Sequence, residues 1–155
     1  MTGGSKVCLA VLAIIVLGAL SAPFVTPYEP DAIDLDSIRV PPGKDHLMGT
    51  DNKGRDVFTR ILYGGRISIG VAFFAASLSL VIGMLSGLCS GYFGGKVDLV
   101  IMGFVDVVLS FPSLLLAIAI SVLLPSGVHT VVIAIAAVGW APFARIVRGG
   151  DTQSP

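Results

Sequence analysis

The sequence predicts an all-α membrane protein with four transmembrane helices and one polar insert. The chain is 54% hydrophobic and 13% charged, whereas soluble proteins contain about 25% charged residues. Its mean hydropathy is +0.91. Four apolar runs match the length of about 20 residues that a helix needs to cross the roughly 30 Å hydrocarbon core of a bilayer. The runs are 7–25, 67–93, 97–124 and 128–147.

The first run, 7–25, has two interpretations. A secretory signal peptide would need a small-residue cleavage site after its apolar core, and Ala19-Leu20-Ser21 loosely supplies one. However, Pro23 follows closely and three further membrane-length runs lie downstream. We therefore expect an uncleaved N-terminal transmembrane helix within 1–25.

The polar insert, 26–66, begins as a connector rich in proline and in turn signals, which excludes a long helix there. From Asp56 the apolar residues recur at helical spacing, with Asp56 and Arg60 on the opposite side. This pattern predicts a short interfacial helix that leads into the membrane. On composition alone, its acidic and basic residues form a solvated face.

The second run, 67–93, carries small residues at every fourth position. Membrane helices associate through close packing, and small residues let their backbones approach. Glycine and alanine are also common in membrane helices generally, but five in register favour a packing ridge. Its members are Ala75, Ser79, Gly83, Gly87 and Gly91.

The third run, 97–124, contains two features that a lipid-facing helix avoids. Asp106 lies eight residues after Asp98, which is about 12 Å along a helix. Pro112 removes a backbone donor and predicts a kink. We expect Asp106 to face protein or water, with Arg145 as its most plausible partner in this chain; a protonated carboxyl or a bond to the backbone is the alternative.

The fourth run, 128–147, contains Trp140 and Pro142, and Arg145 near its end and Arg148 just after it close the run. Trp140 is predicted to be either an interfacial anchor or a packing residue beside a kink at Pro142. A polar tail without periodicity follows over 150–155.

Charge alone predicts a cytoplasmic insert, because the positive-inside rule counts Lys and Arg near the helix ends. Six basic residues lie in the insert and four lie on the other side. The six are Arg39, Lys44, Lys53, Arg55, Arg60 and Arg66; the four are Lys6, Lys96, Arg145 and Arg148.

No catalytic or cofactor motif is present in the sequence. His46 and His129 are the two histidines, and neither has a metal-ligand partner at a useful spacing. The stretch before Val97 lacks the first glycine and the hydroxyl residue of a phosphate-binding loop. The formal net charge of zero gives no basic surface for nucleic acid. Cys8 and Cys89 lie in apolar runs, so we expect small buried side chains and no disulfide framework.

Three segments resemble the second permease subunit of the dipeptide, oligopeptide and nickel ABC importers. The most specific reads H-x-x-G-T-D-x-x-G-R-D, followed by R and G-x-R-x-S, and begins at His46. The others are 91–98 with Asp106 and 111–113, and 139–141 with 144–149. The signature residues are Gly49, Thr50, Asp51, Gly54, Arg55, Asp56, Arg60, Gly65 and Arg66. No motif is apparent in 26–45.

The resemblance implies a multi-pass protein of the plasma (inner) membrane with a cytoplasmic amino terminus. It places 26–66 outside the cytoplasm, which reverses the prediction from charge, and makes 67–149 part of a permease transmembrane domain. It further implies a second permease, two ATPase subunits that use the ATP, an extracytoplasmic solute-binding protein, and no cofactor in this chain. The solute pathway would lie at the interface of the two permeases.

Family members continue beyond the basic end of 128–147 into a cytoplasmic E-A-A…G loop and two more spans. Since 150–155 has no such pattern, we expect a fragment or a truncated or frameshifted product. The alternative function is a small self-associating membrane protein, such as a pore former or an assembly factor, that uses the Gly83–Gly91 part of the ridge. A membrane enzyme is disfavoured by the lack of catalytic motifs.

Overall fold

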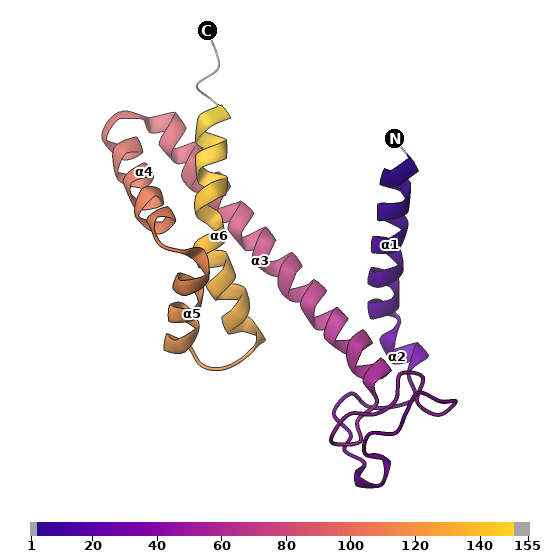
Figure 1. The fold of residues 1–155 in the computed structure, drawn as a ribbon. Coiled ribbons are helices and arrows are strands. Elements are labelled where there is room, and N and C mark those ends of the chain that lie inside the picture. Colours follow the sequence, from indigo (N-terminus) through magenta and orange to yellow (C-terminus); the bar gives the residue numbers. More distant parts are fainter. Residues whose placement is uncertain (1–2, 151–155) are drawn as a thin grey trace. The chain divides into compact units, whose positions relative to one another are not determined.

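A computed structural model describes residues 3–150, and every regular element in this range is a helix. Figure 1 shows the order of the elements along the chain. The α-helices are α1 (Gly3–Leu20), α2 (Ala22–Val25), α3 (Val57–Phe93), α4 (Gly95–Ser110), α5 (Ser113–Leu123) and α6 (Val128–Gly150), with one 3₁₀ turn, η1 (Leu35–Ser37). The predicted all-α class is therefore confirmed. The tail 151–155 lies outside the described residues.

The chain forms two compact units that divide within α3, after Gly70. The first contains α1, α2, the connector and the start of α3. The second contains the rest of α3 with α4, α5 and α6. The boundaries expected from sequence at 25/26, 66/67 and 149/150 remain predictions.

Two helices, α3 and α6, are each long and apolar enough to cross a membrane. The pair α4 and α5 has the composition of a third span but is bent by 94° at its break. The remaining expected span corresponds to α1, a shorter apolar helix. The apolar run 7–25 is interrupted after Leu20. Pro23, in the first turn of α2, has no backbone N–H to donate, and its ring would clash with the preceding turn if α1 continued.

The helix expected just before the second span is present, but the expected boundary between it and the span at residue 67 is wrong. Residues 57–66 are the first turns of α3, which continues without a break for 37 residues. Gly64 and Gly65 lie at the expected junction, but a helix-interior glycine costs only about 1 kcal/mol relative to alanine. Neighbouring helical residues outweigh that cost.

The first unit is built on close contact between α1 and the start of α3. Gly65 of α3 lies against Ala19, and a β-carbon added at Gly65 would be 3.4 Å from the Ala19 Cβ. Gly18 faces Leu62 in the same way, at 3.7 Å. Ala19 is buried, as is Ala22 of α2. Small side chains thus allow these two helices to pack.

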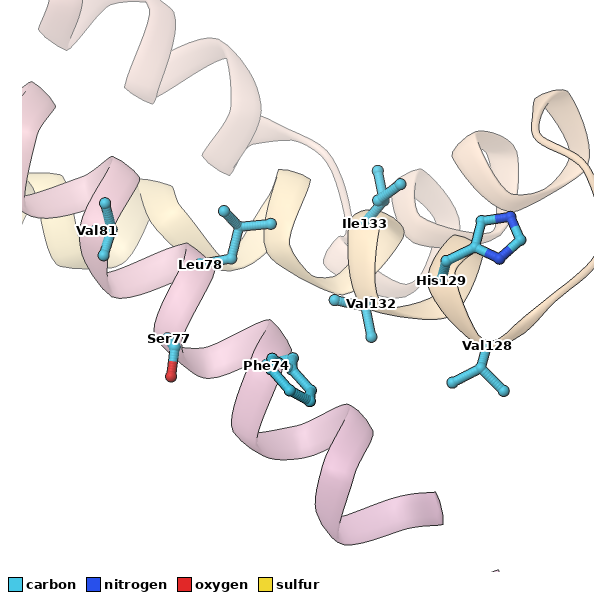
Figure 2. A pocket seen from close by; sticks show the side chains of 8 residues that line it. All are labelled: Phe74, Ser77, Leu78, Val81, Val128, His129, Val132 and Ile133. Atoms are coloured by element: carbon cyan, nitrogen blue, oxygen red, sulfur yellow. The ribbon is translucent and has the colours of Figure 1, made fainter.

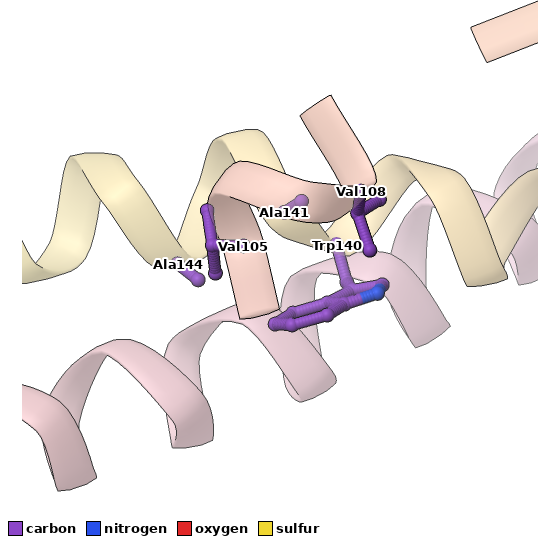
Figure 3. Packing of buried hydrophobic residues seen from close by; sticks show 5 residues of the cluster. All are labelled: Val105, Val108, Trp140, Ala141 and Ala144. Carbon is purple, nitrogen blue, oxygen red and sulfur yellow. The ribbon is translucent and has the colours of Figure 1, made fainter. Parts of the chain in front are cut away.

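The core of the second unit lies where α6 packs along α4 and α5 (Figure 1). Figure 3 shows the buried cluster, which consists of Val105, Val108, Trp140, Ala141 and Ala144. Trp140 is 9% exposed, and its ring stacks on Phe104 with 6.0 Å between centroids. Of its two predicted roles, Trp140 therefore has the packing role. Pro142 lies inside α6, which continues as one helix on both sides of it.

The two cysteines correct another expectation. Cys8 on α1 and Cys89 on α3 are both free and exposed. An apolar sequence run marks a helix that can enter lipid, but it does not say which of its faces meets protein. Both thiols lie on helix faces that residues 3–150 leave uncovered.

Candidate functional site

The small-residue ridge of α3 packs directly on α6. A β-carbon added at Gly83 would lie 2.5 Å from the Phe143 Cβ and 2.6 Å from the Trp140 carbonyl oxygen. One added at Gly87 would lie 2.7 Å from the Ala144 carbonyl oxygen. The two backbones approach so closely that only glycine fits at these positions.

The ridge extends differently from its predicted course. Ala75 and Ser79 are buried like Gly83 and Gly87, but Gly91 is exposed and Ser90 is buried in its place. A helix turns 100° per residue, so steps of four advance the contact line by about 40° each. After four such steps, at Gly91, the line has rotated away from the packed face. Ser90, three residues after Gly87, is buried and bonds Asp98 of α4.

The chain breaks between α4 and α5 at Phe111 and Pro112. Both residues have extended backbone angles, with ψ of 142° and 119°. The kink expected at Pro112 is thus a full interruption of the helix. No side-chain hydrogen bond caps α5 at Pro112, although the Leu116 amide donates to the Pro112 carbonyl oxygen at 3.1 Å.

Two ion pairs join α4 to α6. Arg145 Nη2 bonds the Asp106 Oδ1 oxygen, which is the partner suggested by the sequence. Arg148 binds Asp98 through two nitrogens, Nη2 to Oδ2 at 2.7 Å and Nε to Oδ1 at 3.1 Å. Ser90 at the end of α3 also donates to Asp98. Asp98 therefore connects three helices.

The Asp98 contacts were missed at the sequence level. The available signal was that Asp98 and Arg148 carry opposite charges and lie on the same predicted side of the membrane. Fifty positions separate them in the chain, so no local pattern pairs them.

In the first unit, Asp51 lies at the centre of the signature loop. Its Oδ1 oxygen accepts the backbone amides of Lys53 at 2.8 Å and Arg55 at 3.1 Å. Its Oδ2 oxygen accepts Arg55 Nε and Arg60 Nη1, each at 2.8 Å. The hydrogen bond from the Arg55 side chain, opposed in part by burial, holds the pKa of the Asp51 carboxyl far below its usual range. This carboxylate closes the loop and attaches it to α3.

Two glycines let the signature loop lie against the connector. Gly49 and Gly54 have φ angles of +72° and +74°, a region that favours glycine. A β-carbon at Gly49 would collide with the Val40 carbonyl oxygen, and one at Gly54 with that of Asp34. Other residues at these positions would separate the two segments.

Hydrogen bonds complete the contact between the loop and the connector. The Thr50 hydroxyl accepts the Val40 amide at 2.8 Å and donates to the Ser37 carbonyl oxygen. The Thr50 amide donates to Val40 at 3.0 Å, and the Arg39 amide donates to Asp51 at 3.1 Å. These hydrogen bonds fix the connector against the signature loop.

Asp56 immediately precedes α3 and is 5% exposed, so the solvated face predicted here is wrong for this residue. Its Oδ2 oxygen accepts the Thr59 amide at 2.7 Å, and its Oδ1 oxygen lies 3.0 Å from His46 Nδ1. Burial raises the pKa of the Asp56 carboxyl, but the Thr59 and His46 contacts outweigh it and lower the pKa overall. The His46 ring also stacks on Tyr28 at 4.9 Å. Asp56 is a buried helix cap.

The last two signature residues, Gly65 and Arg66, lie further along α3. Gly65 faces α1 as described above, and Arg66 is exposed. Among the described residues, no group of three or more His, Cys, Asp or Glu side chains could hold a metal ion. His46 is engaged with Asp56, and His129 is exposed at the start of α6.

An apolar groove of about 650 Å³ runs between α3 and the start of α6 (Figure 2). Ser77 and His129 are its only polar lining residues. The lining is Phe74, Ser77, Leu78, Val81, Val128, His129, Val132 and Ile133. This surface suits hydrocarbon and offers little to a charged solute.

Comparisons with known proteins agree with this architecture. Residues 79–150 match the family described as the binding-protein-dependent transport system inner membrane component. Residues 4–42 match the N-terminal transmembrane domain of oligopeptide transport permease C. This second match includes part of the connector, in which the sequence had shown no motif.

Three curated relatives cover nearly the whole chain. The oligopeptide permease OppC of Bacillus subtilis (strain 168) is 43% identical over 149 residues, which is 96% of this chain and 49% of the relative. The dipeptide permease DppC of the same organism is 40% identical over 145 residues, or 94% and 45%. The nickel permease NikC of Escherichia coli (strain K12) is 37% identical over 143 residues, or 92% and 52%.

The chain spans about half the length of these relatives. The bundle of apolar helices and the two family matches define a multi-pass membrane component of binding-protein-dependent transport. Within that class, the chain belongs to the family of the oligopeptide, dipeptide and nickel C-type permeases.

Proposed function

We propose that this chain forms part of the translocation pathway of an ABC importer for peptides, nickel or a related small solute. The observation that carries the proposal is its 43% identity to an oligopeptide permease across 96% of its length. The closely packed helices and the ordered signature loop support a role as a membrane scaffold.

The partners would be a second permease, two ATPase subunits and an extracytoplasmic solute-binding protein. The chain would perform no catalysis and hold no cofactor, since the ATPase subunits would use the ATP. Its amino terminus would lie in the cytoplasm and its signature loop outside, in the plasma (inner) membrane. A reporter enzyme active on only one side of the membrane, inserted at exposed Gly43, would test this orientation.

The alternative of a small self-associating membrane protein required the Gly83–Gly91 part of the ridge to meet another copy. In the structure Gly83 and Gly87 instead contact α6 of the same chain. That contact removes the observation that favoured self-association and supports the permease proposal.

The direct test is a chimera in which residues 1–149 replace the matched half of the B. subtilis oligopeptide permease C. In a strain lacking that subunit, we expect the chimera to restore peptide-dependent growth and uptake of a labelled peptide. A chimera that reaches the membrane in normal amount and binds its partner permease, yet restores no uptake, would overturn the proposal for peptides. Nickel uptake in a matching chimera with the nickel permease would distinguish the solute.

A further inference from the structure

Asp106 and Arg145 form an ion pair that the described residues leave exposed, although both lie within apolar helices. The Asp106 side chain is 66% exposed and that of Arg145 is 55% exposed. Ionisable residues in transmembrane segments are costly when they face lipid and normally face the bundle interior or a water-filled cavity. Something polar must therefore cover this pair in the membrane.

The hydrogen-bonding capacity of the pair points to water. The recorded bond joins one guanidinium nitrogen to one carboxylate oxygen. An arginine carries five N–H donors, and a carboxylate has about four acceptor positions. The two charges already neutralise each other, so no charged partner is required. Several additional hydrogen bonds are required, and water supplies them without a special geometry.

The exposed side of α4 around Asp106 carries further positions that are open to water. At 100° per residue, Gly103 and Ser110 lie within about 60° of Asp106 on the helix, and all three are exposed. We call these three residues the polar stripe. The exposed Val100 and Val107 lie about 100° to 120° from Asp106, further round the helix. Leu99 and Leu109 are also exposed within about 60° of Asp106, so that side of α4 is mixed. The exposed carboxylate of Asp106 and the Ser110 hydroxyl distinguish it from the side of Val100 and Val107.

The break after α4 lies at the end of the same stripe. Ser110 is the last residue of α4, and its hydroxyl donates to the Val107 carbonyl oxygen at 2.7 Å. The final carbonyls of a helix and the first amides of the next have no partners within their own helices. At membrane depth such groups are tolerated only where protein or a water-filled cavity satisfies them. The break between α4 and α5 therefore needs polar surroundings, as the Asp106–Arg145 pair does.

We propose that the polar stripe, together with Arg145, lines a water-filled space, while Val100 and Val107 on the same helix face lipid. Identifying this space with the solute route rests on the proposed function. The hydration of the stripe does not, because it follows from the exposed charges and their position on α4.

The test is cysteine accessibility in a chain whose two native thiols are removed by Cys8→Ser and Cys89→Ser. Both native thiols are exposed and would otherwise react. Single cysteines are then placed by Gly103→Cys and Ser110→Cys on the polar stripe, and by Val107→Cys as the control. Gly103 has open space beside it, and Val107 is 55% exposed, so neither change disturbs a packed contact.

Right-side-out and inverted membrane vesicles that contain the assembled transporter are treated with a charged, membrane-impermeant maleimide. We expect the cysteines at 103 and 110 to react from at least one side several-fold faster than the cysteine at 107. Reaction after denaturation gives the total thiol in each sample. Equal slow reaction at all three positions would mean that protein or lipid covers the stripe, and would overturn the proposal. Equal fast reaction would also overturn it.

The labelling requires no transport, so its outcome is separate from that of the chimera experiment. Uptake without selective labelling would contradict the hydrated stripe and leave the permease function standing. Selective labelling in a chimera without uptake would support the hydrated stripe and contradict the permease function.

Discussion

The signature loop and the helical bundle both contain arginine–carboxylate pairs, but they are stabilised in different ways. In the loop, Asp51 receives two backbone amides and two arginine side chains at once. In the bundle, Gly83 and Gly87 bring α3 against the backbone of α6, and ion pairs join α4 to α6.

The difference follows from the surroundings. The segment 26–56 has few buried apolar side chains, so its shape depends on hydrogen bonds and on a shared carboxylate. Helices in lipid gain little from the hydrophobic effect, because lipid tails are as apolar as leucine. Close approach of their backbones must supply the packing. Arginine–carboxylate contacts therefore matter most for the loop, and close packing of small residues matters most for the bundle.

The largest expected effect is on the bundle, from Gly83→Ala. The added methyl would meet the Phe143 side chain and the Trp140 carbonyl at under 3 Å, and overpacking of this kind costs about 1–3 kcal/mol. Thermal unfolding in detergent should show a clear loss of stability. The control is Gly103→Ala on α4, where the methyl meets open space. At that position the higher helix propensity of alanine should stabilise the protein slightly. An equal loss of thermal stability in both variants would contradict the packing role of the ridge.

A smaller effect is expected at the junction of loop and helix, from Asp56→Ala. Loss of the cap on α3 should cost about 1 kcal/mol, with increased hydrogen exchange confined to 46–60. Asp31→Ala, which changes an exposed carboxylate of the connector, should leave exchange unchanged. A uniform increase across α6 would show that the two regions are not independently stabilised.

The Asp106–Arg145 pair should contribute less. A double-mutant cycle with Asp106→Asn and Arg145→Gln should give a coupling of about 0.6 kcal/mol, typical of polar contacts between membrane helices. Unfolding in detergent measures each corner of the cycle. A coupling of several kcal/mol would mean that the pair is deeply buried in the native membrane, against the hydrated stripe.

The smallest effect is the response of the loop to acid. The folded pKa values of Asp51 and Asp56 are both lowered, so their stabilisation is complete above the unfolded value of about 3.9. It is lost as the pH falls through the folded values. Limited proteolysis should therefore show a loop that is protected at pH 5 to 7 and opens only in stronger acid. Asp51→Asn should open the loop at all pH values and leave a weaker response to acid, which is due to Asp56.

Local chemistry made several features predictable. Apolar runs of membrane length identified α3, the α4–α5 pair and α6, and Pro112 marked the break, because a missing amide has the same consequence in any helix. The four-residue spacing of small side chains placed Gly83 and Gly87 on a packed face. The order of Gly, Thr, Asp and Arg after His46 was specific enough to indicate the family.

Tertiary structure decided what depends on residues distant in the chain. Whether α3 starts at 57 or 67 depends on the balance between two glycines and their helical neighbours, and the packing of Gly65 on α1 belongs to that balance. The exposure of Cys8 and Cys89 depends on which helix faces find partners. Ser90, and not Gly91, is buried at the end of the ridge, because the position of the neighbouring helices decides which face of α3 is covered.

The sequence by itself determined the class of the protein, its apolar segments and the residues of its signature. Only the folded chain showed that Asp51 binds two arginines, that Asp98 joins Ser90 to Arg148, and that the Asp106–Arg145 pair remains open. The physical reason is that composition and spacing report the environment each segment can enter. A hydrogen bond between residues fifty positions apart depends on the geometry of the helices that carry them.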